Sequence, residues 1–381
     1  MPPLHQPFRR AVRPRELKWV LILALIFSTA LTVVCSPAVG TADYLIDLWT
    51  SDNGLPDSSV TAIAQTPDGY LWIGTYNGLA RFDGVQFVDF DPFNTPELKN
   101  ARVDGLFVDA QGTLWINTHD GSMTSWRNGV LTHEWQGGQV SAVFSRSNLI
   151  FFALLRGQLV CRTGSSEEQP QWQSIPLAGP TAGTLFRQDT AGVIWYATRD
   201  GALERIIGTN SEPVSSATYL NGERVNCLTS DGAGRIWVGT EKRLLLWRSD
   251  HFEDQTPTNG EAVVNTSFIA CTASNGCWVL ADGKVRKCVG RQWVAEANWW
   301  EDLGQVNPTF LGAYEDGDGG VWFRNYGRGL FHAKPDGTTQ RISAADGLPD
   351  DRVGCWFQDH EGNLWVADAP DLARPSNGRR R

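Results

Sequence analysis

Apolar and polar residues alternate over short segments along most of the chain. In the clearest unit the segments are VTAIAQ at 60–65, YLWIGT at 70–75, LARFDG at 79–84 and FVDF at 87–90. Such alternation is typical of strands that are buried on one face. TPDG joins the first two segments and YNG the next two, and both turns supply the positive φ angles that tight hairpins need. The pattern therefore predicts four antiparallel strands, and no long segment after residue 42 has a helical period.

The same unit recurs along the chain with a period of about 42 residues. A Trp after a polar, Gly-containing turn stands at positions 72, 115, 195, 237, 278, 322 and 365. The one double step, between 115 and 195, contains SNLIFFALLRGQLV, in which Phe151 or Phe152 takes the place of the Trp. The sequence therefore contains eight units, and four short strands in each unit predict a β-propeller.

The repeated Trp is expected to form the core of this fold. A four-stranded sheet cannot bury both faces alone, so the sheets stack as blades around an axis. Trp72 and its equivalents would fill the space between blades, where each side chain can bury roughly 150–250 Å². Gly74 and Gly239, two residues after a Trp, would let the next sheet approach. We therefore expect an all-β fold, a propeller of four-stranded antiparallel blades.

Two ring sizes remain open. YLIDLWTSDNGLPD at 44–57 recurs as TQRISAADGLPD at 339–350, and the two GLPD copies begin 293 residues apart, close to seven periods. This spacing favours seven blades in residues 43–352, with Tyr44–Trp49 closing the last blade. Residues 353–381 would then be an additional blade fragment with a frayed tail. In the alternative, they are the last blade of an eight-bladed ring that the same strand closes.

The first 42 residues have the features of an export signal. Five cations precede a continuous apolar run, WVLILALIFSTALTVV at 19–34, and small residues follow it. This order predicts a signal peptide that is cleaved after Ala38 or Ala42. The run is also about long enough to remain as a signal anchor. Both alternatives place the rest of the chain in the periplasm or on the extracellular face of the inner membrane.

Charge and composition argue against several function classes. The net charge of -9 leaves no basic excess for a nucleic-acid partner. Metal-ligand spacing of Cys or His is absent, and EDGDGG and DHEGN lack the further carboxylates of a calcium loop. No catalytic cluster emerges either. We expect a protein without a cofactor or a metal, and one that is not an enzyme.

The cysteines predict a disulfide in an oxidising compartment. Cys277 and Cys288 flank the turn ADGK, which places them opposite each other on neighbouring strands. Cys271 lies on the preceding strand. Either a Cys277–Cys288 or a Cys271–Cys277 bridge is expected.

Several units resemble one known repeat. NGLPDSSVTAIAQTPDGYLWIGTYNGLARFDGVQF closely resembles the two-component regulator propeller repeat, and DGLPDDRVGCWFQDHEGNLWVA and DGAGRIWVGT are further matches. The resemblance covers about residues 44–367 and is weakest at 140–174. In that family such propellers form the extracytoplasmic sensor of hybrid histidine kinases and related receptors. The resemblance implies the sensor part alone, with a membrane-bound histidine kinase or a second propeller as a partner.

A ligand is expected at the mouth of the axis. By analogy with other propellers, we expect it on the face of the loops between blades and the second hairpin of each blade. The candidate ligand-binding residues there are Tyr76, Arg102, His119, Arg199, Arg224, Lys242, Trp299, Trp300 and Arg328. Cations and aromatic rings together suit an oligosaccharide, especially an anionic one. Trp299 and Trp300 lie off the repeat register, although one of them would also suit as a cap on a blade edge.

Three functions follow from this pattern. An exported, ligand-sensing propeller is favoured. The alternatives are a secreted propeller enzyme that acts on polysaccharide and an interaction scaffold that pairs with another propeller or forms a homodimer.

Overall fold

The structure is a computed structural model. It describes residues 49–146, 149–154, 158–163, 171–177, 185–198, 200–214, 220–263, 265–271, 276–297, 313–316, 318–325 and 327–368. All of them belong to the unit Ala42–Arg381, and only this unit is described below. The expected leader at 1–42 and the tail at 369–381 lie outside the described residues.

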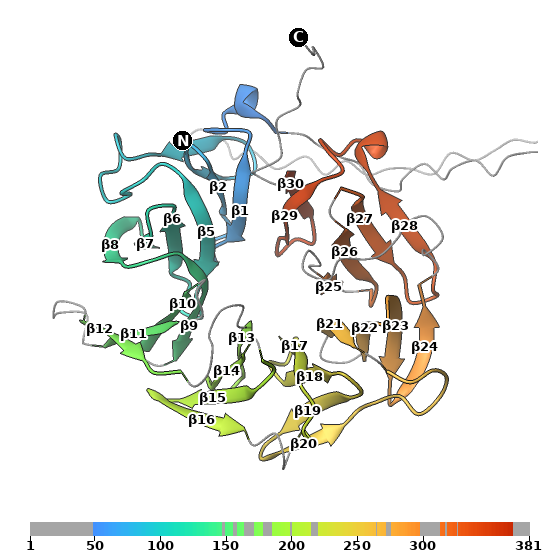
Figure 1. Cartoon of the computed structure of the whole chain (residues 1–381). Coiled ribbons are helices and arrows are strands. Elements are labelled where there is room, and N and C mark those ends of the chain that lie inside the picture. Colours follow the sequence, from blue (N-terminus) through green and yellow to red (C-terminus); the bar gives the residue numbers. More distant parts are fainter. Residues whose placement is uncertain are drawn as a thin grey trace, which may run out of the picture. The chain divides into compact units, whose positions relative to one another are not determined.

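Seven four-stranded antiparallel sheets follow one another along the chain, and we call them blades 1 to 7 (Figure 1). Blades 1 to 3 are β1 (Val60–Gln65), β2 (Leu71–Thr75), β3 (Gly78–Phe82) and β4 (Phe87–Phe90); β5 (Val103–Val108), β6 (Leu114–Thr118), β7 (Ser122–Arg127) and β8 (Val130–Gln136); β9 (Val140–Arg146), β10 (Leu149–Leu154), β11 (Leu159–Thr163) and β12 (Gln171–Ile175). Blades 4 and 5 are β13 (Leu185–Gln188), β14 (Ile194–Ala197), β15 (Leu203–Ile207) and β16 (Asn210–Val214); β17 (Val225–Ser230), β18 (Ile236–Thr240), β19 (Leu244–Arg248) and β20 (His251–Asp254). Blades 6 and 7 are β21 (Thr266–Cys271), β22 (Cys277–Ala281), β23 (Lys284–Val289) and β24 (Gln292–Glu296); β25 (Ala313–Glu315), β26 (Val321–Asn325), β27 (Gly329–Ala333) and β28 (Thr339–Ile342).

The blades are arranged as a β-propeller, which confirms the predicted fold class. In each blade the strands pair in chain order, and the first strand lies toward the middle of the ring (Figure 1). The hairpin between the second and third strands therefore shares one face with the loop that leads from one blade to the next. We call this face the upper face, and the opposite one, with the other two hairpins of each blade, the lower face.

An eighth sheet has two strands, β29 (Val353–Gln358) and β30 (Leu364–Asp368), and it lies between blades 7 and 1. Val353 and Trp356 pack with Trp322 of blade 7. On the other side, Gln65 of blade 1 accepts a hydrogen bond from the backbone N–H of His360 (2.7 Å). A mostly apolar cavity of about 770 Å³ lies among blade 1, blade 7 and this sheet. The two-stranded sheet thus joins the ends of the blade series.

The chain enters β1 and β29 through the same kind of turn. The 3₁₀ turns η1 (Ser51–Asn53) and η4 (Ala344–Asp346) each carry a capping box, and each ends at a glycine with positive φ, Gly54 at 102° and Gly347 at 110°. These glycines begin the two GLPD copies, so the sequence repeat encodes a turn that only glycine adopts readily.

The fourth strand of blade 7 is β28, which takes the place where Tyr44–Trp49 was expected to close this blade. A short hairpin brings β28 onto β27, and this local pairing costs little loop-closure entropy. Of the expected closing strand only Trp49 is described. Its ring lies 5.0 Å from that of Trp365 and 5.8 Å from that of Phe82, so this residue packs between the two-stranded sheet and blade 1.

The repeated Trp residues are core, as predicted. Trp72, Trp195 and Trp278 are fully buried, and Trp365 alone of the seven is half-buried, on the two-stranded sheet. In blades 2, 4 and 5 and in the two-stranded sheet, the indole N–H donates to an Asp six residues earlier, at 2.8–3.0 Å. The same Asp accepts backbone N–H groups of its own hairpin. One carboxylate therefore folds the hairpin and holds the indole between blades.

The degenerate third blade keeps this arrangement with Phe. Phe151 pairs with Phe144 and Cys161, as Trp72 pairs with Ala64 and Arg81. Phe151 packs toward blade 4, whereas Phe152 packs toward blade 2. Phe151 thus takes the place of the Trp.

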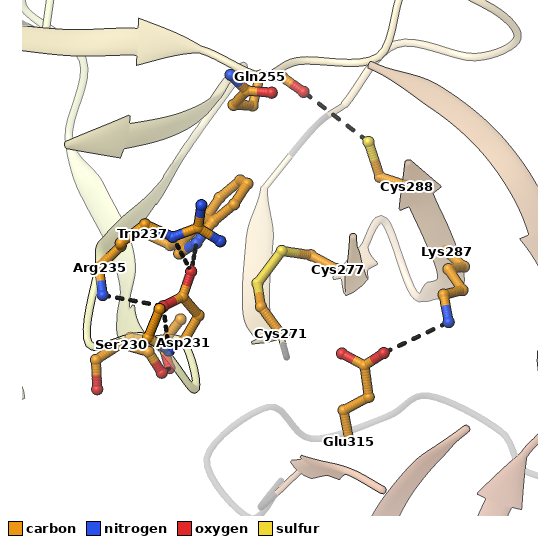
Figure 2. The surroundings of a disulfide bond; sticks show 12 residues. Ser230, Asp231, Arg235, Trp237, Gln255, Cys271, Cys277, Lys287, Cys288 and Glu315 are labelled. Carbon is orange, nitrogen blue, oxygen red and sulfur yellow. Dashed lines mark hydrogen bonds and ion pairs between the residues drawn. A yellow bond between two sulfur atoms is a disulfide. The ribbon is translucent and has the colours of Figure 1, made fainter. Parts of the chain in front are cut away.

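Cys271 and Cys277 form a disulfide between β21 and β22, the second of the two expected pairings (Figure 2). Cys288 lies opposite Cys277 on the other side, in β23, but its thiol is not bridged. Burial raises the pKa of this thiol to about 11, so it stays protonated.

We expect Asp189→Ala to lower the free energy of unfolding by about 2–3 kcal/mol, because the buried indole N–H of Trp195 and two backbone N–H groups lose their acceptor. Urea unfolding measures this. Asp68→Ala is the control, because in blade 1 the indole donates to Thr66 and Asp68 is exposed. Equal losses in the two variants would contradict this role of the carboxylate.

We expect Gly74→Ala to destabilise the protein by about 1–3 kcal/mol, because the new Cβ would lie 2.6 Å from Cγ1 of Val103 in blade 2. Thermal unfolding of the single variants and of Gly74→Ala with Val103→Ala tests the contact. The double variant should lose less than the sum of the two single losses. Strict additivity would show that Gly74 does not mark a close approach of the blades.

We expect Cys271→Ser to cost about 2 kcal/mol of stability, the entropy of a loop that spans six residues. Cys355→Ser, which removes a half-buried cysteine outside any disulfide, should cost clearly less. Peptide mapping without reductant should find Cys271 linked to Cys277. A link between Cys277 and Cys288 would refute the pairing.

Candidate functional site

The innermost strands share an irregularity at their upper end. Six first strands have a β-bulge at their second residue: β1, β5, β9, β17, β21 and β29. The bulged residues are Thr61, Asp104, Ser141, Asn226, Ser267 and Gly354. A bulge re-aims the side chain of its extra residue, and proteins use it beside functional sites. Asp104 is the one charged residue among these six.

Asp104 gathers side chains from two blades. One carboxylate oxygen accepts from Nε of Arg102 at 2.9 Å. The other lies 2.9 Å from Nδ1 of His119 and accepts from Nε2 of Gln139, in the loop before β9, at 2.8 Å. The carboxylate is mostly shielded, with 18% of its side chain exposed, which strengthens these contacts.

Tyr76 of blade 1 extends the cluster. The guanidinium of Arg102 lies 4.2 Å from the centre of the Tyr76 ring, a cation–π contact between blades 1 and 2. Arg102 is thus held from two directions, by the ring and by Asp104. We call Tyr76, Arg102, Asp104, His119 and Gln139 the upper cluster.

Backbone hydrogen bonds fix the loops that carry these side chains. The N–H of Tyr76, after β2, donates to the carbonyl of Ser59 before β1, at 3.2 Å. In blade 2 the N–H of His119 donates to the carbonyl of Arg102 at 2.9 Å. Each hairpin is therefore tied to the loop beside it, and the upper cluster rests on a rigid base.

The upper cluster presents unused donors. Among the residues that the structure describes, no side chain or carbonyl accepts from the two terminal nitrogens of Arg102 or lies at Nε2 of His119. Half of the His119 side chain is exposed (51%). Next to it, burial opposes ionisation of Asp120, but hydrogen bonds from Thr118 and Ser122 hold the pKa of this carboxyl below its usual value. The cluster can thus donate to an anionic or hydroxylated ligand.

The other predicted site residues do not join this cluster. In blade 4, Nε of Arg224 donates to the carbonyl of Asp200 at 3.0 Å. Lys242 of blade 5 and Arg328 of blade 7 are exposed. Arg199, Trp299 and Trp300 lie outside the described residues. The structure therefore brings together Tyr76, Arg102 and His119 only.

Sequence reasoning missed Asp104 and Gln139. The signal for Asp104 is present: when the units are aligned, it is the one charged residue at the second position of a first strand. Gln139 has no such signal, because its contact depends on how blade 3 packs on blade 2.

Metal sites and membrane-spanning helices are both absent from the described residues. No group of three or more His, Cys, Asp or Glu in this part of the chain has the geometry to hold a metal ion. No described helix is long and apolar enough to cross a membrane.

Comparison with solved structures finds several similar folds. The yeast Saccharomyces cerevisiae Sqt1 is 10% identical, with a TM-score of 0.58, over 84% of this chain and 95% of that one. The extracellular domain of the putative hybrid two-component system BT4673 from B. thetaiotaomicron is 16% identical, with a TM-score of 0.32, over 81% of this chain and 51% of that domain. That of BT3049 from the same organism is 15% identical, with a TM-score of 0.32, over 85% of this chain and 58% of that domain. The chain thus spans little more than half of these two extracellular domains.

The repeat itself is also matched. The family model described as two component regulator propeller matches residues 54–77, 219–242 and 347–369. These segments cover the start of blade 1, the start of blade 5 and the two-stranded sheet, in each case the entry loop, the first two strands and the Trp. Three segments of this propeller therefore match the two-component regulator propeller repeat.

Proposed function

We propose that this protein is an extracytoplasmic sensor propeller that binds an anionic oligosaccharide at the upper cluster. The observation that carries the proposal is Arg102, which is stacked on Tyr76 and fixed by Asp104 while its terminal nitrogens keep no protein acceptor among the described residues. A guanidinium held in this way is preorganised to grip a carboxylate or sulfate with both nitrogens.

The chemistry of the neighbouring groups favours a sugar as the carrier of that anion. Asp104 and Gln139 offer oxygen and amide groups that can bond hydroxyls, and His119 adds an exposed ring nitrogen. Aromatic and guanidinium faces also suit the apolar faces of sugar rings. A lipid tail would leave these polar groups without partners, which costs affinity.

The location outside the cytoplasm is part of this proposal. It is supported by the basic, apolar and small-residue order of residues 1–42. The two B. thetaiotaomicron structures are described as extracellular domains of putative hybrid two-component systems. By the same reasoning, the occupied propeller passes its signal to a membrane-bound histidine kinase or to a second propeller.

The contact between His119 and Asp104 supports a second candidate function. A carboxylate at Nδ1 orients an imidazole so that Nε2 can act as a base, as in many enzymes. With Arg102 beside it, the same cluster would suit an enzyme that removes a proton next to a uronate carboxylate. Product formation from the bound glycan distinguishes this enzyme from a sensor.

We expect Arg102→Ala to weaken binding of an oligouronate at least about tenfold, because one charged, two-pronged contact is lost. Isothermal titration of the full-length protein, with a neutral oligosaccharide of equal length as the reference ligand, measures this. Arg127→Ala, at the lower end of blade 2, is the matched control and should leave the affinity unchanged.

Three outcomes decide the proposal. Equal affinities of the wild type and Arg102→Ala for the oligouronate would show that the upper cluster is not the binding site. Equal affinities for the charged and neutral glycans would refute the anionic ligand. Shortened or unsaturated products, absent with His119→Ala, would establish the enzyme instead.

A further inference from the structure

A second concave site lies on the lower face, between blades 5 and 6. This cavity has a volume of about 200 Å³. Arg235, in the hairpin before β18, and Arg248, at the end of β19, line it from blade 5. Arg291, in the hairpin between β23 and β24, lines it from blade 6. Since these hairpins lie at the opposite ends of the strands from the upper cluster, the cavity is a separate site, which we call the lower cavity.

The charged residues that line the lower cavity are all positive. Three guanidinium groups line it, and no carboxylate is among its lining residues. The acids nearby lie behind the arginines: Asp231 accepts from Nε of Arg235 at 2.7 Å, and Glu253 from Nε of Arg248 at 3.1 Å. Both contacts use Nε. The acids therefore orient these two cations without covering the cavity.

Arg291 is presented by an unusual turn. Gly290 and Arg291 are the two central residues of a tight hairpin, with φ of 55° and 65°. Asn and Gly are preferred at such positions, and an arginine there is disfavoured. Its Nε donates to the carbonyl of Thr256 in the loop after blade 5, at 3.2 Å. Arg291 has an unfavourable backbone conformation, and its side chain is hydrogen-bonded to the loop after the preceding blade. This combination indicates a function for the side chain.

The guanidinium ends remain available. Among the described residues, the terminal nitrogens of Arg248 and Arg291 have no hydrogen-bond acceptor. The walls behind them are rigid, because Trp237 is held by Asp231 and Cys277 by its disulfide (Figure 2). The site is thus a preformed hollow in which the terminal nitrogens of Arg248 and Arg291 can donate to a ligand.

We propose that the lower cavity binds a small oxyanion group, a carboxylate, sulfate or phosphate. Guanidinium forks match these groups in shape and charge. The volume of about 200 Å³ accommodates one such group. This proposal does not depend on the ligand of the upper cluster.

Isothermal titration of the full-length protein at constant ionic strength tests the proposal. The probes are sodium sulfate, sodium phosphate, glucuronate, glucose 6-phosphate and, as the neutral reference, glucose. At least one anion should bind, and glucose should not. Tighter binding of glucuronate or glucose 6-phosphate than of the inorganic ions would show that the group is carried on a sugar. Equal binding would show that the free anion is the ligand.

Variants locate the site. Arg291→Gln and Arg248→Gln should each weaken anion binding about tenfold or more. Arg205→Gln is the matched control, because Arg205 is also a strand arginine paired with an acid, Glu212 at 3.3 Å, but lies in blade 4 outside the cavity. Arg102→Ala removes the anion-binding group of the upper cluster, so anion binding that persists in Arg102→Ala and is lost in Arg291→Gln belongs to the lower cavity. Two results would overturn the proposal. One is anion binding that is unchanged in both Arg248→Gln and Arg291→Gln, and the other is equal binding of glucose.

Discussion

One buried contact organises this propeller: an indole that lies between two blades while its N–H is held by the carboxylate of the hairpin before it. The contact couples a local event, the folding of a hairpin around an Asp, to a long-range one, the docking of the next blade. A buried indole N–H without an acceptor would cost about 1–3 kcal/mol, which is more than the net contribution of a typical hydrogen bond. The Asp acceptor recurs in blades 2, 4 and 5 and in the two-stranded sheet, whereas Thr66 replaces it in blade 1 and Phe151 replaces the Trp in blade 3.

The functional faces depend on that rigidity. With the blades fixed by their cores, the inner strands can carry a bulge at their upper ends without losing register, and these bulges offer side chains to a ligand. Asp104 uses this freedom. It lies at the start of an inner strand, and from there it collects Arg102, His119 and Gln139 from two blades. The rigid core between the blades thus keeps the loops above it in fixed positions.

The sequence alone predicts what is encoded within one unit. Strand lengths, hairpin turns, the buried Trp and the close approach at Gly74 all follow from patterns of a few residues, and the structure bears them out. It does not predict Gln139, whose contact depends on how blade 3 packs on blade 2. It leaves two partners of Cys277 open, and Cys271 is the one in the structure. The fourth strand of blade 7 is β28, where Tyr44–Trp49 was expected. Arg102 and His119 were found, but the carboxylate that joins them was not.

The two faces differ in where carboxylates lie, and the ligands that we propose for them differ accordingly. On the upper face, Asp104 stands among the donors, so its charge opposes a second anion and favours a ligand that offers hydroxyls together with a single acid group. On the lower face, Asp231 and Glu253 accept from Nε of Arg235 and Arg248, and the charged residues that line the cavity are all arginines. A compact, strongly charged anion would gain most there. The two proposed sites would therefore differ in selectivity, because one includes a carboxylate and the other does not.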